Sequence, residues 1–175
     1  MPTGPITIRR VTTVDGAMVD ALAAILRDCV DGGASVGFMA SLPATTATAF
    51  WQRVAAGVHD GERALLVAED AAGPVGTVQL VLAQPDNQPH RVDLAKMLVH
   101  RRARRHGLGA ALMRAAEAMA RDCGKSLLVL DTVTGGDAER LYTRLGWNRC
   151  GVIPNFALFP DGRPCDTTYF YRTLA

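Results

Sequence analysis

Hydrophobic and polar positions along the chain predict a mixed succession of strands and helices. Residues 6–10 alternate between apolar and polar, as in a short strand. After Asp15, a predicted N-cap, apolar residues recur at helical spacing until Asp31-Gly32-Gly33 ends the pattern. A second helix is predicted from about Thr45 to Gly57, with Phe50, Trp51 and Val54 facing inward.

Three apolar runs follow, and they predict three antiparallel strands over residues 63–69, 75–83 and 90–99. The intervening segments, 70–74 and 84–89, are rich in Asp, Gly, Pro and Asn, which are the residues of tight turns. The third strand therefore leads directly into the segment that begins at His100.

A helical stripe of apolar residues runs from Leu108 to Cys123 and stops before Gly124, where a left-handed cap is expected. Arg114, Glu117 and Arg121 lie off this stripe, so we expect all three to face water.

The remaining pattern places a buried strand over 126–130, a short helix over 136–145, a strand over 148–153 and a final hairpin or strand that ends near Tyr171. Because a helix precedes the 126–130 strand, the crossover rule predicts that it is parallel to the strand before that helix. Asp131 then lies at its carboxyl end, the side on which open α/β sheets bind ligands.

The length of 175 residues suits one domain, which we expect over residues 1–175. A net charge of +2 gives no global basic field, so nucleic-acid binding is not expected, and no apolar run is long enough to predict a membrane span. The four cysteines are scattered, without a Cys-x-x-Cys pair. We therefore expect no metal site, reduced thiols and a cytoplasmic location.

The glycine-punctuated loop over 100–109 is the strongest candidate for a binding site. Arg104, Gly107 and Gly109 are spaced as Arg-x-x-Gly-x-Gly between a strand and a helix. Small residues let a ligand approach the backbone, and the first amides of a helix are free to bind phosphate. Arginines at 101, 102, 104 and 105 would add long-range attraction for a polyanion. The alternative is a tight turn with a solvated basic rim.

A second pattern, Gly33-Ala34-Ser35-Val36-Gly37, matches the Gly-x-Ser-x-Gly of nucleophile elbows. That motif requires a strand before the serine and a helix after it, whereas here a helix precedes and a loop follows. We therefore predict a loop that lines a pocket, or a plain linker between helices, rather than a hydrolase.

These motifs together resemble the GNAT superfamily of acyl-CoA-dependent N-acyltransferases. The resemblance rests on 104–109 after Met97-Leu98-Val99, and on Ala138-Glu139-Arg140-Leu141-Tyr142 with Leu145-Gly146-Trp147 downstream. Segments 32–39 and 159–163 are also similar to the tabtoxin-resistance acetyltransferases of that superfamily. The resemblance implies an α/β (α+β mixed sheet) fold: a mostly antiparallel sheet of six to seven strands with a splayed parallel pair, flanked by about four helices.

The resemblance also implies acetyl-CoA as co-substrate and assigns its binding residues. Backbone groups of Met97, Leu98 and Val99 would hold the pantetheine arm, and an amide near Leu98 would polarise the thioester carbonyl. The pyrophosphate would be wrapped by Arg104, Arg105, His106, Gly107, Leu108, Gly109 and Ala110.

Tyr142 matches the family tyrosine that protonates the departing thiolate, although its spacing also suits a core aromatic residue. An amine acceptor needs help to lose its proton at pH 7, and Asp131 and Asp93 are the candidates for a base or for a group that holds the ammonium. The alternatives are a cap or turn residue for Asp131 and a solvated strand carboxylate for Asp93.

For the acceptor we expect a small-molecule amine, such as an amino-acid-like toxin or antibiotic. Phe38 and Met39 are predicted to line its pocket, with Trp51, Phe156 and Phe159 as further candidates for the pocket or the core. A non-catalytic acyl-CoA sensor and a protein N-terminal or lysine acetyltransferase are the alternatives. A nucleic-acid domain is disfavoured because residues 100–110 contain no aromatic residue. Exposed apolar edges leave room for a homodimer.

Overall fold

The computed structural model describes residues 4–174, so residues 1–3 and 175 of the predicted domain lie outside it. The helices and strands, in chain order, are β1 (Thr7–Val11), α1 (Gly16–Asp31), α2 (Ala44–His59), β2 (Arg63–Asp70), β3 (Gly73–Val81), β4 (Arg91–Val99), the 3₁₀ turn η1 (Arg101–Ala103), α3 (Leu108–Asp122), β5 (Leu127–Val133), α4 (Asp137–Arg144), β6 (Asn148–Leu158) and β7 (Pro164–Thr173).

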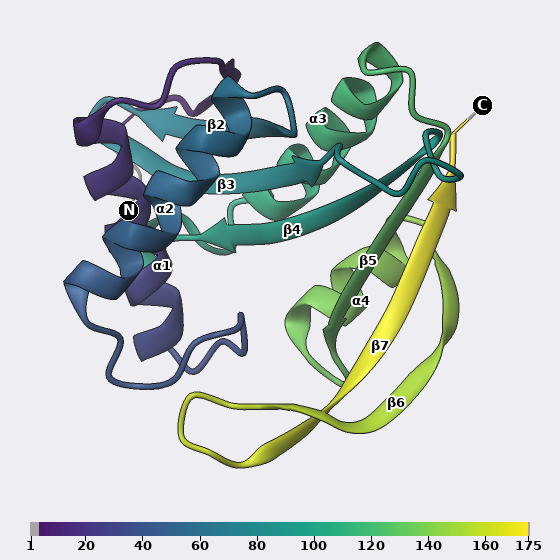
Figure 1. Ribbon diagram of the computed structural model, residues 1–175. Helices are drawn as coiled ribbons and strands as arrows, with labels where there is room; N and C mark the ends of the chain where they lie inside the picture. Colours follow the sequence, from purple (N-terminus) through teal and green to yellow (C-terminus); the bar gives the residue numbers. More distant parts are fainter. Residues whose placement is uncertain (1–3, 175) are drawn as a thin grey trace.

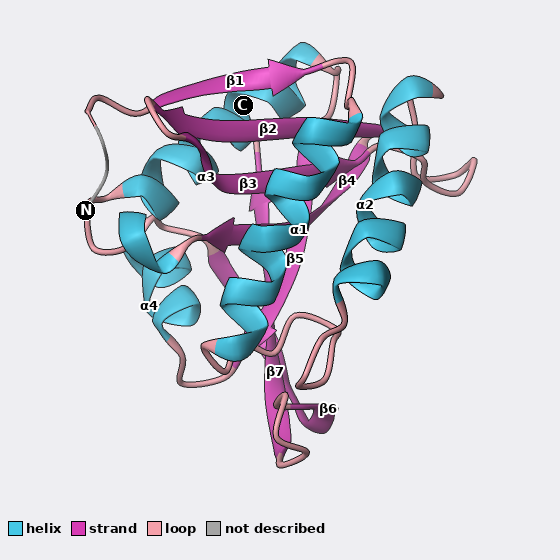
Figure 2. Cartoon of the chain, turned by 90° about the vertical axis from the view of Figure 1, so that its left-hand side faces the viewer, coloured by secondary structure: helices cyan, strands magenta, loops and turns pink. Residues whose placement is uncertain are grey.

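The strands form a seven-stranded mixed sheet in the order β1-β2-β3-β4-β5-β7-β6 (Figure 1). One core, with Trp51 and Leu26 at its centre, packs α1 and α2 against one face of the sheet. The other core packs α3 and α4 against the opposite face and contains Leu112 and Phe170. Seen from the side, β6 and β7 extend beyond the rest of the sheet (Figure 2). The predicted mixed sheet of six to seven strands flanked by about four helices is confirmed.

Local chemistry accounts for the ends of the helices. The carboxylate of Asp15 accepts a hydrogen bond from the N–H of Met18 at 2.8 Å and caps α1, as predicted. Gly124 follows α3 with φ +70°, the left-handed conformation expected of a glycine beyond a helix end.

The parallel pair in the middle of the sheet is short. β4 pairs with β5 only through Arg91–Leu127, Val92–Leu128 and Asp93–Val129. Beyond these positions β4 and β5 diverge, and β5 continues along β7 as far as Val133 (Figure 1). The parallel direction and the splayed pair are both confirmed, and they leave residues 94–99 of β4 without a strand on that side.

A bulge in β4 changes which face its side chains reach. On β3 two steps separate Thr77 from Gln79, but their partners Leu98 and Ala95 are three steps apart. The extra residue lies at Lys96, whose φ of +50° is in the left-handed region. As a result Leu94 packs in the core beneath α3, whereas Leu98 packs in the core beneath α1 and α2.

Two predictions made from local patterns are wrong in detail. Glu117 does not face water: it is 8% exposed and pairs with Arg172 of β7, whose Nε lies 3.3 Å from its Oε2. A partner from a distant strand allows the carboxylate to be buried, whereas Arg114 and Arg121 are exposed as expected. In addition, β5 extends to Val133, so Asp131 lies within the strand rather than at its end.

Candidate functional site

The N-terminus of α3 presents backbone amides without partners. Gly107 is its N-cap residue with φ +74°, and no side chain caps the helix. The N–H of Ala111 donates to the carbonyl of Gly107 at 3.1 Å, the first backbone bond of the helix. The amides of Leu108, Gly109 and Ala110 therefore have no partner within the helix and can bind an anion.

The surroundings of these amides explain the two glycines. A Cβ on Gly107 would have open space within 4 Å, but its positive φ favours glycine. A Cβ on Gly109 would lie 3.0 Å from Cδ2 of Leu141, because α4 packs closely there. Gly107 thus leaves the approach to the amides open, and Gly109 lets α3 lie against α4.

Three arginines of the loop make contacts with other parts of the protein. Arg101 pairs with Asp28, and Arg102 pairs with Asp70, whose side chain is fully buried. Arg104 turns back, and its Nε donates to the carbonyl of Val99 at 2.9 Å. These three side chains hold the loop against α1 and the β2–β3 turn, while Arg101, Arg104 and Arg105 all remain exposed to solvent.

The edge of β4 at the splay carries the other predicted cofactor residues. Met97 and Val99 are half-buried on the α3 side, and Leu98 is buried on the opposite side. Their backbone groups that face β5 have no strand partner there, since the pairing with β5 stops at Asp93. An extended chain with hydrogen-bonding groups fits this gap as an added strand would.

Tyr142 lies in the core between α4 and the sheet and is 5% exposed. Its ring centroid is 6.1 Å from that of Trp147 and 5.9 Å from that of Phe170. Burial raises the pKa of Tyr142 well above its ordinary value, and the charge of Asp131 raises it further. Its hydroxyl makes no hydrogen bond within residues 4–174, and the raised pKa keeps it protonated.

The two predicted carboxylates differ in their exposure and in their partners. Asp131 is exposed, and its Oδ2 accepts a hydrogen bond from Oγ1 of Thr167 at 3.1 Å. Asp93 is occupied by an ion pair with Arg91 and by Nε2 of Gln84 at 3.2 Å. Asp131 is therefore the freer of the two to meet a substrate.

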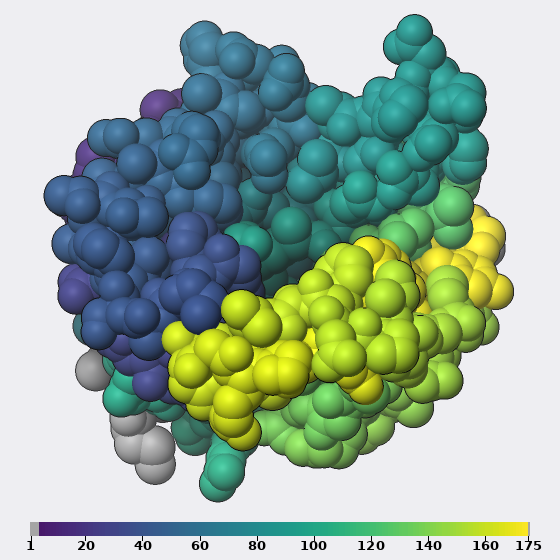
Figure 3. All heavy atoms as spheres, turned by 60° about the horizontal axis from the view of Figure 1, so that its bottom comes forward, coloured from purple at the N-terminus to yellow at the C-terminus, as the bar shows by residue number. Residues whose placement is uncertain are grey.

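A wall of the site is built from two segments far apart in the sequence. Oγ of Ser35 donates to the carbonyl of Leu158 at 2.7 Å, and the N–H of Ala40 donates to the carbonyl of Pro160 at 3.0 Å. Figure 3 shows the yellow-green hairpin against the dark-blue loop, with a hollow between them and the teal segment. Ser35 is thus an anchor in a loop, and its hydroxyl has no histidine partner among the described residues.

The aromatic candidates for the acceptor pocket differ in their exposure. Phe38 is half-buried and packs edge-on against Phe50 of α2 at 5.4 Å, while Met39 beside it is 46% exposed. On the hairpin, Phe156 packs edge-on against Tyr169 at 6.0 Å. Trp51, by contrast, is fully buried and belongs to the core.

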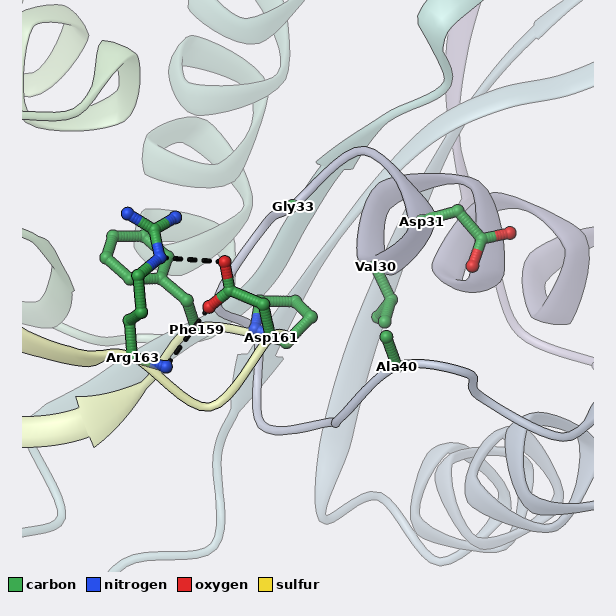
Figure 4. Close-up of a pocket in the computed structure, with 8 residues that line it drawn as sticks. Val30, Asp31, Gly33, Ala40, Phe159, Asp161 and Arg163 are labelled. Carbon is green, nitrogen blue, oxygen red and sulfur yellow. Dashed lines mark hydrogen bonds and ion pairs between the residues drawn. The ribbon is translucent and has the colours of Figure 1, made fainter.

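A separate pocket of about 340 Å³ lies between the end of α1 and the β6–β7 turn (Figure 4). Its polar groups, Asp161 and Arg163, pair with each other at 2.8 Å, and Arg163 also lies 5.2 Å over the Phe159 ring. Asp31 points away from it. Because Tyr142 and Asp131 do not line it, this pocket is not where the chemistry would occur.

Lys96 and Tyr169 are near enough to Asp131 for its charge to raise the pKa of both, and the sequence patterns singled out neither residue. The bulge of β4 turns Lys96 toward Phe50, with Nζ 5.5 Å from the ring centroid. Tyr169 pairs directly with Asp131 across β5 and β7. The signal available in the sequence was a single lysine in an otherwise apolar strand. The side of the sheet that this lysine reaches depends on the bulge, which the sequence pattern does not show.

Two absences hold for the part of the chain that the structure describes. No helix in residues 4–174 is long and apolar enough to cross a membrane. Within the same range, no group of three or more His, Cys, Asp or Glu side chains is arranged to hold a metal ion.

Comparison with known proteins identifies the family to which the chain belongs. The model of the acetyltransferase (GNAT) family matches residues 21–147 of this chain. The match runs from α1 to the end of α4 and includes the α3 N-terminus, the splayed strands, Asp131 and Tyr142.

Solved structures share the whole architecture. A putative acetyltransferase from Salmonella typhimurium with its cofactor acetyl-CoA has a TM-score of 0.79 and 24% identity, covering 98% of this chain and 95% of that chain. A ribosomal-protein-alanine N-acetyltransferase from Brucella melitensis has a TM-score of 0.80 and 24% identity, covering 96% and 99%. A putative phosphinothricin N-acetyltransferase has a TM-score of 0.80 and 18% identity, covering 98% and 99%. At these identities the likeness establishes the fold.

Proposed function

The chain belongs to the GNAT family of acetyltransferases, and on that premise we propose that it transfers the acetyl group of acetyl-CoA directly to the amine of a small molecule. The observation that carries the proposal is the uncapped N-terminus of α3 beside the gap between β4 and β5. Free amides at one end and an unpaired strand edge at the other suit a pyrophosphate joined to an extended amide-bearing arm.

In this proposal acetyl-CoA supplies the activated acetyl group, and the protein positions it. The amides from Arg104 to Ala110 bind the pyrophosphate. Backbone groups of Met97, Leu98 and Val99 bind the arm, and the amide near Leu98 stabilises negative charge on the carbonyl oxygen.

The proton transfers are assigned to Asp131 and Tyr142. Asp131, exposed and hydrogen-bonded to Thr167, takes a proton from the acceptor's ammonium so that the neutral amine can attack the acetyl carbon, or holds the ammonium in place before that proton leaves. Tyr142, whose raised pKa keeps it protonated, donates its proton to the departing thiolate. Asp93 serves as a supporting carboxylate, because Arg91 already neutralises it.

The acceptor we propose is an amino-acid-like amine, as in a toxin or antibiotic. Segments 32–39 and 159–163, which carry the resemblance to tabtoxin-resistance acetyltransferases, lie against each other beside the hollow of Figure 3. The fold neighbours include enzymes named for a protein and for a small molecule, so acceptor class must be decided by assay.

The test is calorimetry with acetyl-CoA on the wild type, Ala110→Asp and Ala110→Asn. An aspartate in the first turn favours the helix dipole but repels a pyrophosphate. We expect Ala110→Asp to bind at least about tenfold more weakly, or about 1.4 kcal/mol, with no loss of thermal stability. The asparagine variant, which is similar in size but uncharged, should lose less of the affinity for acetyl-CoA.

Turnover separates the enzyme from a sensor. We would measure thiol release at saturating acetyl-CoA, first with small amines and then with peptides that carry free N-termini or lysines. We expect the small amines to raise the rate of thiol release. Failure of the wild type to bind acetyl-CoA would refute the function, and binding without turnover of any amine would favour the sensor.

A further inference from the structure

We propose that Lys96 and Arg63 form a subsite that binds the carboxylate of the acceptor, so that the substrate is a molecule carrying both an amine and a carboxylate. The inference rests on the proposed acetyl transfer and narrows its acceptor. It follows from two cations on neighbouring parts of the sheet that have no acidic partner at hydrogen-bond distance among the described residues.

Lys96 has no hydrogen bond or ion pair within residues 4–174. Its neighbours are the ring of Phe50, whose centroid is 5.5 Å from Nζ, and Gly37, where a Cβ would lie 3.7 Å from Nζ. Burial lowers the pKa of Lys96, which shows that its charged form lacks compensation there. A half-buried ammonium of this kind gains from an incoming anion.

Arg63 adds a second unneutralised charge. Its Nη1 donates to Oε1 of Gln79 at 2.9 Å, and its stem packs over Gly57 of α2. It has no ion pair with any described residue, and its charge further lowers the pKa of Lys96. Two like charges repel, and an anion that binds both would relieve that repulsion.

Gln79 gives an independent sign that this side of the sheet is incomplete. The residue is fully buried, but its Nε2 has no hydrogen-bond partner. It pairs across the sheet with Ala95, the residue before Lys96. A buried N–H donor without a partner is costly, and an acceptor oxygen arriving beside Lys96 would supply one.

The opposite charge lies on the neighbouring strand. Asp131 of β5 is exposed, and its field raises the pKa of Lys96, so the two groups sense each other across the gap. An amino acid carries both complementary charges. Its ammonium would lie at Asp131, where the transfer occurs, and its carboxylate at Lys96.

The bulge of β4 determines which face of the sheet the side chain of Lys96 reaches. Without the extra residue, Lys96 would project like Leu94, toward the core beneath α3. The left-handed φ at Lys96 is an uncommon conformation for a non-glycine residue. Such strain is often retained where it aims a functional side chain.

Chemical labelling tests the subsite without turnover. The chain has two lysines, and Nζ of the other, Lys125, is held by the carbonyls of Leu82 and Pro89 at 3.3 and 2.7 Å. Limited acetic anhydride treatment, quantified by mass spectrometry, is compared with and without N-acetyl-L-amino acids and their amides. We expect at least one acid to reduce labelling of Lys96 threefold or more, while its amide and Lys125 show no change. Unchanged labelling of Lys96 with every acid would overturn the proposal.

Kinetics supply the second arm, with L-amino acids compared with their C-terminal amides. We expect the wild type to favour the acids at least tenfold in kcat/KM, and Lys96→Met to lose that preference mainly through KM. Lys96→Arg should keep part of it. Equal rates for acids and amides, or an unchanged preference in Lys96→Met, would overturn the subsite. Because acetyl-CoA binding is measured separately, loss of the function and loss of the subsite give different results.

Discussion

Replacing Tyr142 with phenylalanine removes one oxygen atom and leaves the ring packed against Trp147 and Phe170. The hydroxyl makes no hydrogen bond to any described residue, so we expect the free energy of unfolding to change by less than about 0.5 kcal/mol. As a general acid the same hydroxyl is worth about 10²- to 10⁴-fold in rate. At 1.36 kcal/mol per tenfold, that is about 2.7 to 5.4 kcal/mol of transition-state stabilisation.

The two magnitudes are far enough apart to separate a catalytic role from a packing role. The assay combines urea unfolding, acetyl-CoA calorimetry and kcat by thiol release for Tyr142→Phe, with Tyr171→Phe on the exposed side of β7 as control. We expect normal stability and cofactor affinity with kcat lowered at least about 10²-fold. A kcat within about threefold of wild type would show that Tyr142 is only a core aromatic residue.

The pH dependence follows from the raised pKa of Tyr142. Because the folded protein keeps this hydroxyl protonated above its ordinary pKa of about 10, the rate ratio of wild type to variant should stay constant from about pH 7 to about pH 10. Unfolded tyrosine ionises near pH 10, so its contribution to stability is complete below that value and is lost as the pH rises further. A ratio that fell through pH 8 to 9 would contradict this.

Three further predictions concern the groups around the site. Arg102→Ala should cost about 3–5 kcal/mol of stability in urea unfolding, because it removes the guanidinium that pairs with the buried carboxylate of Asp70; a loss below about 1 kcal/mol would contradict this. Asp131→Asn should lower kcat/KM for the amine by about 10²-fold or more while acetyl-CoA affinity is unchanged, and equal kcat/KM would exclude Asp131 as the base. Gly76→Ala should destabilise by about 1–3 kcal/mol, since its Cβ would lie 3.1 Å from the carbonyl oxygen of Leu98; an unchanged melting temperature would show that the strands can separate there.

Local chemistry in the sequence was sufficient for most elements. The N-cap at Asp15, the stop near Gly32 and the glycine after α3 all depend on neighbours within a few residues, and each lies where predicted. The parallel direction of β5 followed from the helix before it, which is also a local rule. The uncapped N-terminus of α3 could therefore be predicted from Gly107 and Gly109 as a candidate anion site.

Features set by distant partners were not predictable in this way. Glu117 is buried because Arg172, far along the chain, meets it, and the side chain of Arg102 is drawn inward by Asp70. The direction of Lys96 depends on a bulge in the register between β3 and β4. No alternation along β4 alone reveals that an extra residue has been inserted. The cytoplasmic location and the homodimer remain predictions.

The place of β7 in the sheet has a consequence for synthesis of the protein. β7 is the last strand along the chain, yet it lies between β5 and β6 and pairs with both. While the chain emerges from the ribosome, β1 to β4 and α3 can assemble first, but β5 keeps a nearly bare edge until the final residues arrive. The elements proposed to bind the cofactor, β4 and α3, can thus fold before the β5–β7 pair that is proposed to meet the acceptor. Nascent chains stalled before β7 should expose the unpaired edge of β5, which favours aggregation, and should therefore depend on chaperones.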